Sequence, residues 1–166
     1  MSNEIRCYDY VNHPYAMVRD ALIVEPTQLF QSATKAAASR ADSVASELHA
    51  GIAGIGVEAE IKISVKTIEE KDLEDMSVPV TRLHLEWEAA TMPRLFPLMK
   101  ADISIYPLTR TETQLDFFGV YEPPLGTVGK ALNAIAGHRI AEASVHRFVE
   151  DVARHLRQAL SGIAPR

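Results

Sequence analysis

The sequence predicts an α+β domain in which a curved antiparallel sheet wraps around a long C-terminal helix, with two helices after the first strand. Four segments between residues 57 and 119 alternate apolar and polar side chains. An alanine-rich stretch precedes them, and an apolar stripe at three- and four-residue spacing follows them. At 166 residues the chain fits one domain, which we place over residues 1–166.

Composition and charge narrow the class of protein. The chain is 47% hydrophobic and 23% charged, which is typical of globular proteins. Its net charge of -5 argues against a nucleic-acid partner, because duplexes are held mainly by Lys and Arg. We expect neither a membrane span nor a secretory signal, and therefore a cytoplasmic protein. Cys7 is the one cysteine, which excludes an internal disulfide and a cysteine-based zinc site.

One strand and two helices are expected in the first 47 residues. Residues 5–11 are rich in β-branched and aromatic side chains, as in a strand. A helix over residues 15–24 follows Pro14, and a longer helix over residues 26–47 begins at Pro26, where a first turn tolerates proline.

The sequence does not determine which face of the first strand points inward. Asp9 shares the parity of Ile5 and Cys7 and would then be an inward carboxylate. Tyr8 and Tyr10 are also apolar enough to be the inward set. The alternation alone does not decide between them.

The four alternating segments predict strands that each have one solvent-exposed face, at about residues 57–66, 81–89, 99–106 and 113–119. Such strands are typical of an antiparallel sheet covered on one side, because strands of parallel sheets are continuously apolar. Short links between them predict a meander. The residues expected to face inward are Val57, Ala59, Ile61, Ile63, Val65, Leu83, Leu85, Trp87, Ala89, Met99, Ala101, Ile103, Ile105, Leu115, Phe117 and Gly119.

Helical periodicity resumes after Pro123 and Pro124, which cannot continue a strand ladder. Gly137 is expected to kink or divide the helical region. The last helix, over some 24 residues, would be roughly 36 Å long and would cross the whole sheet. It is the one long amphipathic element that we expect to cover the apolar face.

A curved sheet around one helix encloses more volume than the helix fills, which predicts a cavity with an apolar lining and a few polar groups. The residues expected to line it are Ile61, Ile63, Leu85, Trp87, Met99, Ile103, Phe117, Tyr121, Leu132, Ile135, His138, Val145 and Phe148.

The element order, with the stretch FFGVYEPPLG at 117–126 and the helix GHRIAEASVHRF at 137–148, resembles the SRPBCC superfamily. This is the START-like, Bet v 1-like or helix-grip group, which includes polyketide cyclases, and the chain is similar to its uncharacterised bacterial single-domain members. The resemblance implies a deep cavity for lipids, polyketides or other apolar molecules. It implies no universal catalytic motif, so no catalytic residue and no cofactor is carried over.

Three residues of the predicted lining carry polar groups. His138 would place a titratable ring in the cavity, or act as a cap or surface group at the helix break. Tyr121 would bring its hydroxyl to the cavity mouth, or serve as a structural corner tyrosine. Trp87 would anchor a ligand through its indole N–H, although filling the core is the favoured interpretation.

Two further patterns are weaker. Glu142, His146 and Glu150 share one helix face and would suit a divalent metal, but a solvated stripe is the favoured interpretation and we expect no metal. Ser32 and Lys35 match the Ser-x-x-Lys of penicillin-binding enzymes, but the accompanying motifs are missing.

The sequence therefore favours a protein that binds or carries a hydrophobic small molecule such as a lipid or polyketide. The alternatives are a cyclase or dehydratase that uses the same cavity, and a protein-interaction module. We expect a binder before an enzyme, with no cofactor, and the oligomeric state, monomer or homodimer, stays open.

Overall fold

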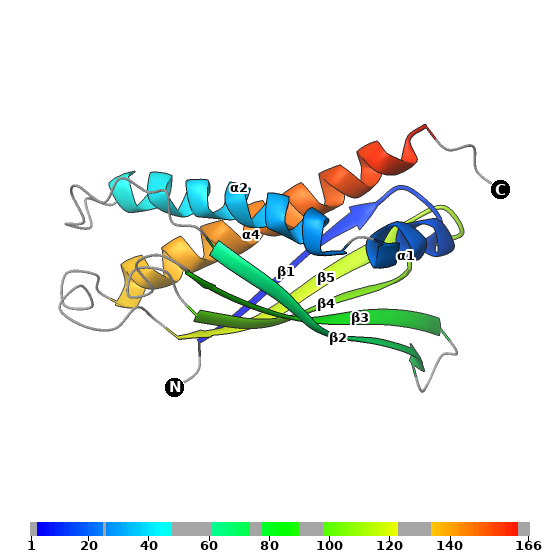
Figure 1. The fold of residues 1–166 in the computed structure, drawn as a ribbon, viewed down its shortest axis with the longest axis horizontal. Helices are drawn as coiled ribbons and strands as arrows, with labels where there is room; N and C mark the ends of the chain where they lie inside the picture. The colour runs from blue at the N-terminus through cyan, green and yellow to red at the C-terminus, as the bar shows by residue number, and fades with distance from the viewer. Residues whose placement is uncertain are drawn as a thin grey trace.

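The fold is taken from a computed structural model that describes residues 3–24, 26–47, 61–73, 78–89, 98–122 and 134–162 (Figure 1). The order of elements is strand, two helices, four strands and one long helix, which confirms the predicted α+β class. The elements are β1 (Asn3–Val11), α1 (Tyr15–Val24), α2 (Pro26–Glu47), β2 (Ile61–Leu73), β3 (Val78–Ala89), β4 (Leu98–Pro107), β5 (Thr113–Glu122) and α4 (Ala134–Leu160).

The five strands form one antiparallel sheet in the order β1-β5-β4-β3-β2. The strands from β2 to β5 make the predicted meander, and β1 returns to pair along its whole length with β5, from Asn3 opposite Tyr121 to Val11 opposite Thr113. With a long C-terminal helix on one face and two helices after the first strand, this is the helix-grip fold. The predicted fold class is confirmed.

The period-two alternation places side chains as predicted. Leu83, Trp87 and Phe117 are each at most 2% exposed on the helix side of the sheet, because burying apolar area drives folding. Of the expected inward residues, Val57 and Ala59 lie outside the described residues, the side chains of Ile61 and Ala89 are not described, and Val65 is only partly buried. The other buried residues of this face are Ile63, Leu85, Met99, Ala101, Ile103, Ile105, Leu115 and Gly119.

The first strand turns Asp9 toward the helices. Ile5, Cys7 and Val11 are buried on that face, whereas Tyr8 and Tyr10 are 75% and 51% exposed on the other. Asp9 lies at the rim, where its Oδ1 accepts a hydrogen bond from Arg157 Nη2 of α4 at 2.9 Å. The alternative in which the tyrosines face inward is excluded.

β2 is longer than predicted and contains a bulge. It continues to Leu73, and its register against β3 shifts between Val65 and Thr67. A bulge bends and twists the strand locally. Beyond it, Glu70 lies opposite the buried Thr81 and its Oε1 accepts a hydrogen bond from Arg19 of α1 at 2.5 Å.

The expectation that α4 alone covers the sheet is wrong. α2 lies beside α4 over the same face, toward β2, while α4 lies over β1 (Figure 1). Phe30, Ala33 and Ala37 of α2 are at most 1% exposed. Alanines at this spacing present little bulk, which lets two helices pack closely.

The predicted division at Gly137 is also wrong. α4 runs without interruption through Gly137 for 27 residues, or about 40 Å. One glycine in a helix costs only about 1 kcal/mol, which the packing of such a long helix outweighs. Among the described helices, none is both long and apolar enough to cross a membrane.

Candidate functional site

One end of the apolar face forms a row of four paired residues. Ile63 lies opposite Trp87, Trp87 opposite Met99, and Met99 opposite Tyr121, so the row crosses four strands. All four are at most 5% exposed. Tyr121 supplies a hydroxyl at the β5 end of a row that is otherwise largely apolar.

The hydroxyl of Tyr121 meets His138 of α4. The Oη and Nδ1 atoms are 2.8 Å apart, and the ring centroids are 6.1 Å apart. Burial raises the pKa of Tyr121, and the charge of Glu142 raises it further. The hydroxyl therefore keeps its proton at neutral pH, and the tautomer of His138 decides whether the hydroxyl donates a hydrogen bond to Nδ1 or accepts one from it.

This pair joins the interior to the surface. Tyr121 is 3% exposed, whereas the His138 side chain is exposed. The sequence singled out both residues separately, and the fold brings them into contact because the end of β5 lies against the N-terminal part of α4.

Four aromatic rings fill the middle of the space between sheet and helices. Phe148 of α4 contacts Trp87, Phe117 and Phe30, with ring centroids 5.1, 5.9 and 5.9 Å apart. The rings are stacked or edge-on, and such pairs contribute roughly 0.5–1.5 kcal/mol each beyond area burial. The sequence analysis missed Phe30, which its position one turn before Ala33 would have signalled.

The predicted lining residues fall into three groups. Leu132 lies outside the described residues, and only the backbones of Ile61 and Ile135 are described. The His138 side chain is exposed. The remaining predicted residues, each at most 5% exposed, are Ile63, Leu85, Trp87, Met99, Ile103, Phe117, Tyr121, Val145 and Phe148. A packed core and a cavity wall both bury such side chains, so the cavity stays a prediction.

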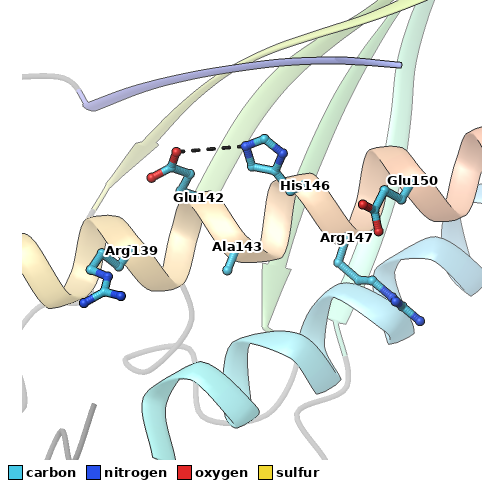
Figure 2. Close-up of a pocket in the computed structure, with 6 residues that line it drawn as sticks. All are labelled: Arg139, Glu142, Ala143, His146, Arg147 and Glu150. Atoms are coloured by element: carbon cyan, nitrogen blue, oxygen red, sulfur yellow. Dashed lines mark ion pairs between the residues drawn. The ribbon is translucent and has the colours of Figure 1, made fainter. Parts of the chain in front are cut away.

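The outer face of α4 carries an open pocket of about 520 Å³ (Figure 2). Glu142 and His146 point to one side of α4, whereas Ala143 and Arg147 point to the side where α2 lies. The pocket is lined by Arg139, Glu142, Ala143, His146, Arg147 and Glu150. It contains the predicted stripe of Glu142, His146 and Glu150.

His146 connects this stripe to β1. Its Nδ1 is 3.3 Å from Cys7 Sγ, and its Nε2 is 3.9 Å from Glu142 Oε1. Burial, followed by the charge of Asp9, raises the pKa of Cys7 to about 11, so the thiol is protonated and unreactive at neutral pH. Within the described ranges, no group of three His, Cys, Asp or Glu side chains is placed to hold a metal ion.

Comparison with solved structures finds similar proteins across the whole chain. The Zhui aromatase/cyclase from Streptomyces sp. R1128 is 13% identical, with all of both chains covered and a TM-score of 0.49. A conserved protein from Geobacillus kaustophilus is 14% identical over 95% of this chain and 97% of that chain, with a TM-score of 0.48. Ara h 8.0201 is 8% identical over 95% and 99%, with a TM-score of 0.46.

The chain has a helix-grip fold. The element order and strand pairing of this chain build that fold, as the resemblance implied. No family model and no curated protein matches the sequence.

Proposed function

We propose that this helix-grip protein binds a hydrophobic small molecule that carries one polar group, such as a lipid or polyketide-like compound. The observation that carries the proposal is the Tyr121–His138 hydrogen bond of 2.8 Å at the end of an apolar row. Ligand sites combine an apolar wall with a few polar groups that fix orientation.

The aromatic cluster limits where such a ligand would sit. Trp87, Phe148, Phe117 and Phe30 occupy the centre of the interior, so we place the ligand at the β5 side of the end row, against Met99 and Tyr121. Its polar group would meet the Tyr121 hydroxyl.

A matched pair of ligands tests this placement. We expect the protein to bind 2-naphthol more tightly than naphthalene, as measured by displacement of a fluorescent naphthalene sulfonate. Tyr121→Phe should remove most of that preference, a change of about 2- to 10-fold for one hydrogen bond.

Tyr106→Phe is the control variant. Tyr106 lies on the opposite face of the sheet, where its hydroxyl donates to Asp116 Oδ2 at 2.9 Å, so its loss should leave the preference unchanged. Equal affinity for both ligands in the wild-type protein, or no binding of either, would contradict the proposal. Native mass spectrometry of protein from its own host would then identify any retained apolar molecule.

The same pair favours a cyclase or dehydratase as the second candidate. In the tautomer whose protonated Nδ1 donates to Tyr121 Oη, the Tyr121 hydroxyl is free to donate to a carbonyl oxygen and His138 Nε2 is free to take a proton from carbon or water. A β-hydroxythioester should then lose water in a reaction followed by mass spectrometry. His138→Gln should abolish the loss of water and keep naphthol binding, which separates the enzyme from the binder.

A protein-interaction module stays a prediction without a specific site. The large exposed apolar side chains of the described residues are Tyr8, Tyr10, Val24, Ile68 and Leu108, which come from four different segments. Single exposed apolar residues are normal on globular proteins.

A further inference from the structure

A second polar cluster lies where α2 packs against α4. His155 of α4 has Ser32 of α2 on one side and Asp151, one turn earlier in α4, on the other. Its Nε2 is 3.4 Å from Ser32 Oγ. Its Nδ1 is 3.0 Å from the Asp151 carbonyl oxygen and 3.3 Å from Asp151 Oδ2.

The hydrogen bonds determine which ring nitrogen of neutral His155 carries the proton. A carbonyl oxygen only accepts, so Nδ1 must be protonated to bond to the Asp151 carbonyl. Nε2 then has a free lone pair, and the Ser32 hydroxyl donates to it. A serine that donates to an imidazole held in this tautomer has the arrangement of an activated nucleophile.

Asp151 completes the arrangement from a buried position. Its side chain is 2% exposed, and its Oδ1 is held by Arg154. Its Oδ2 has no hydrogen-bond donor among the described residues, although it lies beside the protonated edge of His155. A buried carboxylate here stabilises the imidazolium that forms when His155 takes a proton.

We propose that Ser32 is a nucleophile toward activated carboxylic esters, with His155 as its general base and Asp151 as a positioning residue. Ser32 Oγ attacks the ester carbonyl carbon while its proton moves to His155 Nε2. The tetrahedral intermediate collapses, the bond to the leaving oxygen breaks, and His155 returns the proton to that oxygen. Water, deprotonated by His155, then attacks the acyl carbon. The bond to Ser32 Oγ breaks, His155 returns the proton to that oxygen, and the carboxylic acid leaves.

Access and charge fit this chemistry. Ser32 is partly exposed, and 38% of the His155 side chain is exposed, so a small ester can reach both. Lys35 is exposed one turn after Ser32, and i,i+3 residues are neighbours on a helix. We assign the developing negative charge to Lys35. The Ser-x-x-Lys pattern of the sequence thus has a local use.

Covalent labelling tests the nucleophile. A fluorophosphonate probe loses fluoride to an activated serine, and we expect one phosphonate on the wild-type protein, mapped to Ser32 by peptide mass spectrometry. Ser32→Ala should remove it. His155→Gln should slow labelling at least about 100-fold, the usual scale of general-base assistance. Ser161→Ala is the control, because Ser161 is exposed and its hydroxyl donates to the Gln158 carbonyl at 2.9 Å.

The histidine tautomer gives a second readout that does not depend on reactivity. We expect the ¹⁵N shifts of neutral His155 to show a protonated Nδ1 and an unprotonated Nε2. Asp151→Asn should shift the tautomer population and slow labelling at least about 10-fold while the circular dichroism stays unchanged.

Three results would overturn the proposal: no label on the folded wild-type protein, a label that persists in Ser32→Ala, or a proton found on Nε2. None of these depends on apolar binding, so this proposal and the ligand-binding proposal can fail separately.

Discussion

Phe117 and Phe118 are neighbours in β5, yet they lie in opposite surroundings. Phe117 is 2% exposed and packs between Trp87 and Phe148. Phe118 is half-buried on the other face, where the Arg6 guanidinium lies 4.6 Å from its ring centroid. The difference teaches that the face of the sheet, rather than residue type, determines what each aromatic ring contributes.

The largest expected effect is on stability. Phe117→Ala should lower the free energy of unfolding by about 3–5 kcal/mol, because it removes buried area and leaves a cavity. Phe118→Ala should lower the free energy of unfolding by less. Phe118 is only half-buried, and its exposed cation–π contact with Arg6 contributes about 1 kcal/mol or less. Urea denaturation of both variants measures this, and equal losses would break the comparison.

Gly119 sharpens the comparison on the buried face. A Cβ there would lie 2.7 Å from a Phe117 ring carbon and 2.9 Å from Met99 Sδ. Gly119→Ala should therefore cost about 1–3 kcal/mol through overpacking. Gly162→Ala is the control, because a Cβ there meets nothing within 4 Å. Thermal unfolding of the two variants should separate them, and a neutral Gly119→Ala would show that the ring and the sulfur move apart easily.

The pKa values of two tyrosines, one on each face of the sheet, extend the comparison. Burial, then the hydrogen bond to Asp116, raises the pKa of Tyr106 to about 12, while burial and Glu142 raise that of Tyr121. An unfolded tyrosine ionises near 10, so stability should be full below that pH and fall as pH rises through the folded values. The tyrosinate absorbance should show late ionisation of Tyr106 and Tyr121. Tyr106→Phe should remove part of this late signal, and an unchanged titration curve would contradict the prediction.

The smallest effect concerns the bulged end of β2. The hydrogen bond from Arg19 lowers the pKa of the exposed Glu70 carboxyl below 4.5. Its stabilisation is therefore present above that pH and is lost as pH falls through the folded value. Arg19→Met should flatten this part of the acid unfolding curve, and high salt should do the same to the wild-type protein. An unchanged curve would mean that the pair contributes nothing.

Most of the sheet was predictable from the sequence, because side-chain polarity alternates wherever one face of a strand is buried and the other is exposed to solvent. Leu83 and Trp87 follow that rule. The bulge after Val65 was not predictable, since the run from Thr67 to Asp72 holds one apolar residue, Ile68, and so shows no alternation. The role of α2 was missed because its buried stripe is mostly alanine, which differs little in hydrophobicity from its surroundings.

The candidate site was predictable only in part. Tyr121 and His138 were recognised from strand parity and helix position. Their contact depends on how α4 packs against β5, which the sequence pattern does not show. The cluster of Ser32, Asp151 and His155 was missed. It joins residues that are 123 positions apart on two helices, and their alignment is set by packing rather than by local periodicity.

The place of β1 at the sheet edge also bears on synthesis in the cell. Val11 cannot find Thr113 until some hundred further residues have been made, which takes roughly 5 to 20 s at common translation rates. During that interval the β1 segment has no strand to pair with, and its backbone hydrogen-bonding groups and two tyrosines are exposed. The segments of α1 and α2 can already form helices. Chaperone occupancy on ribosomes stalled before and after the last strand would show how the growing chain is shielded.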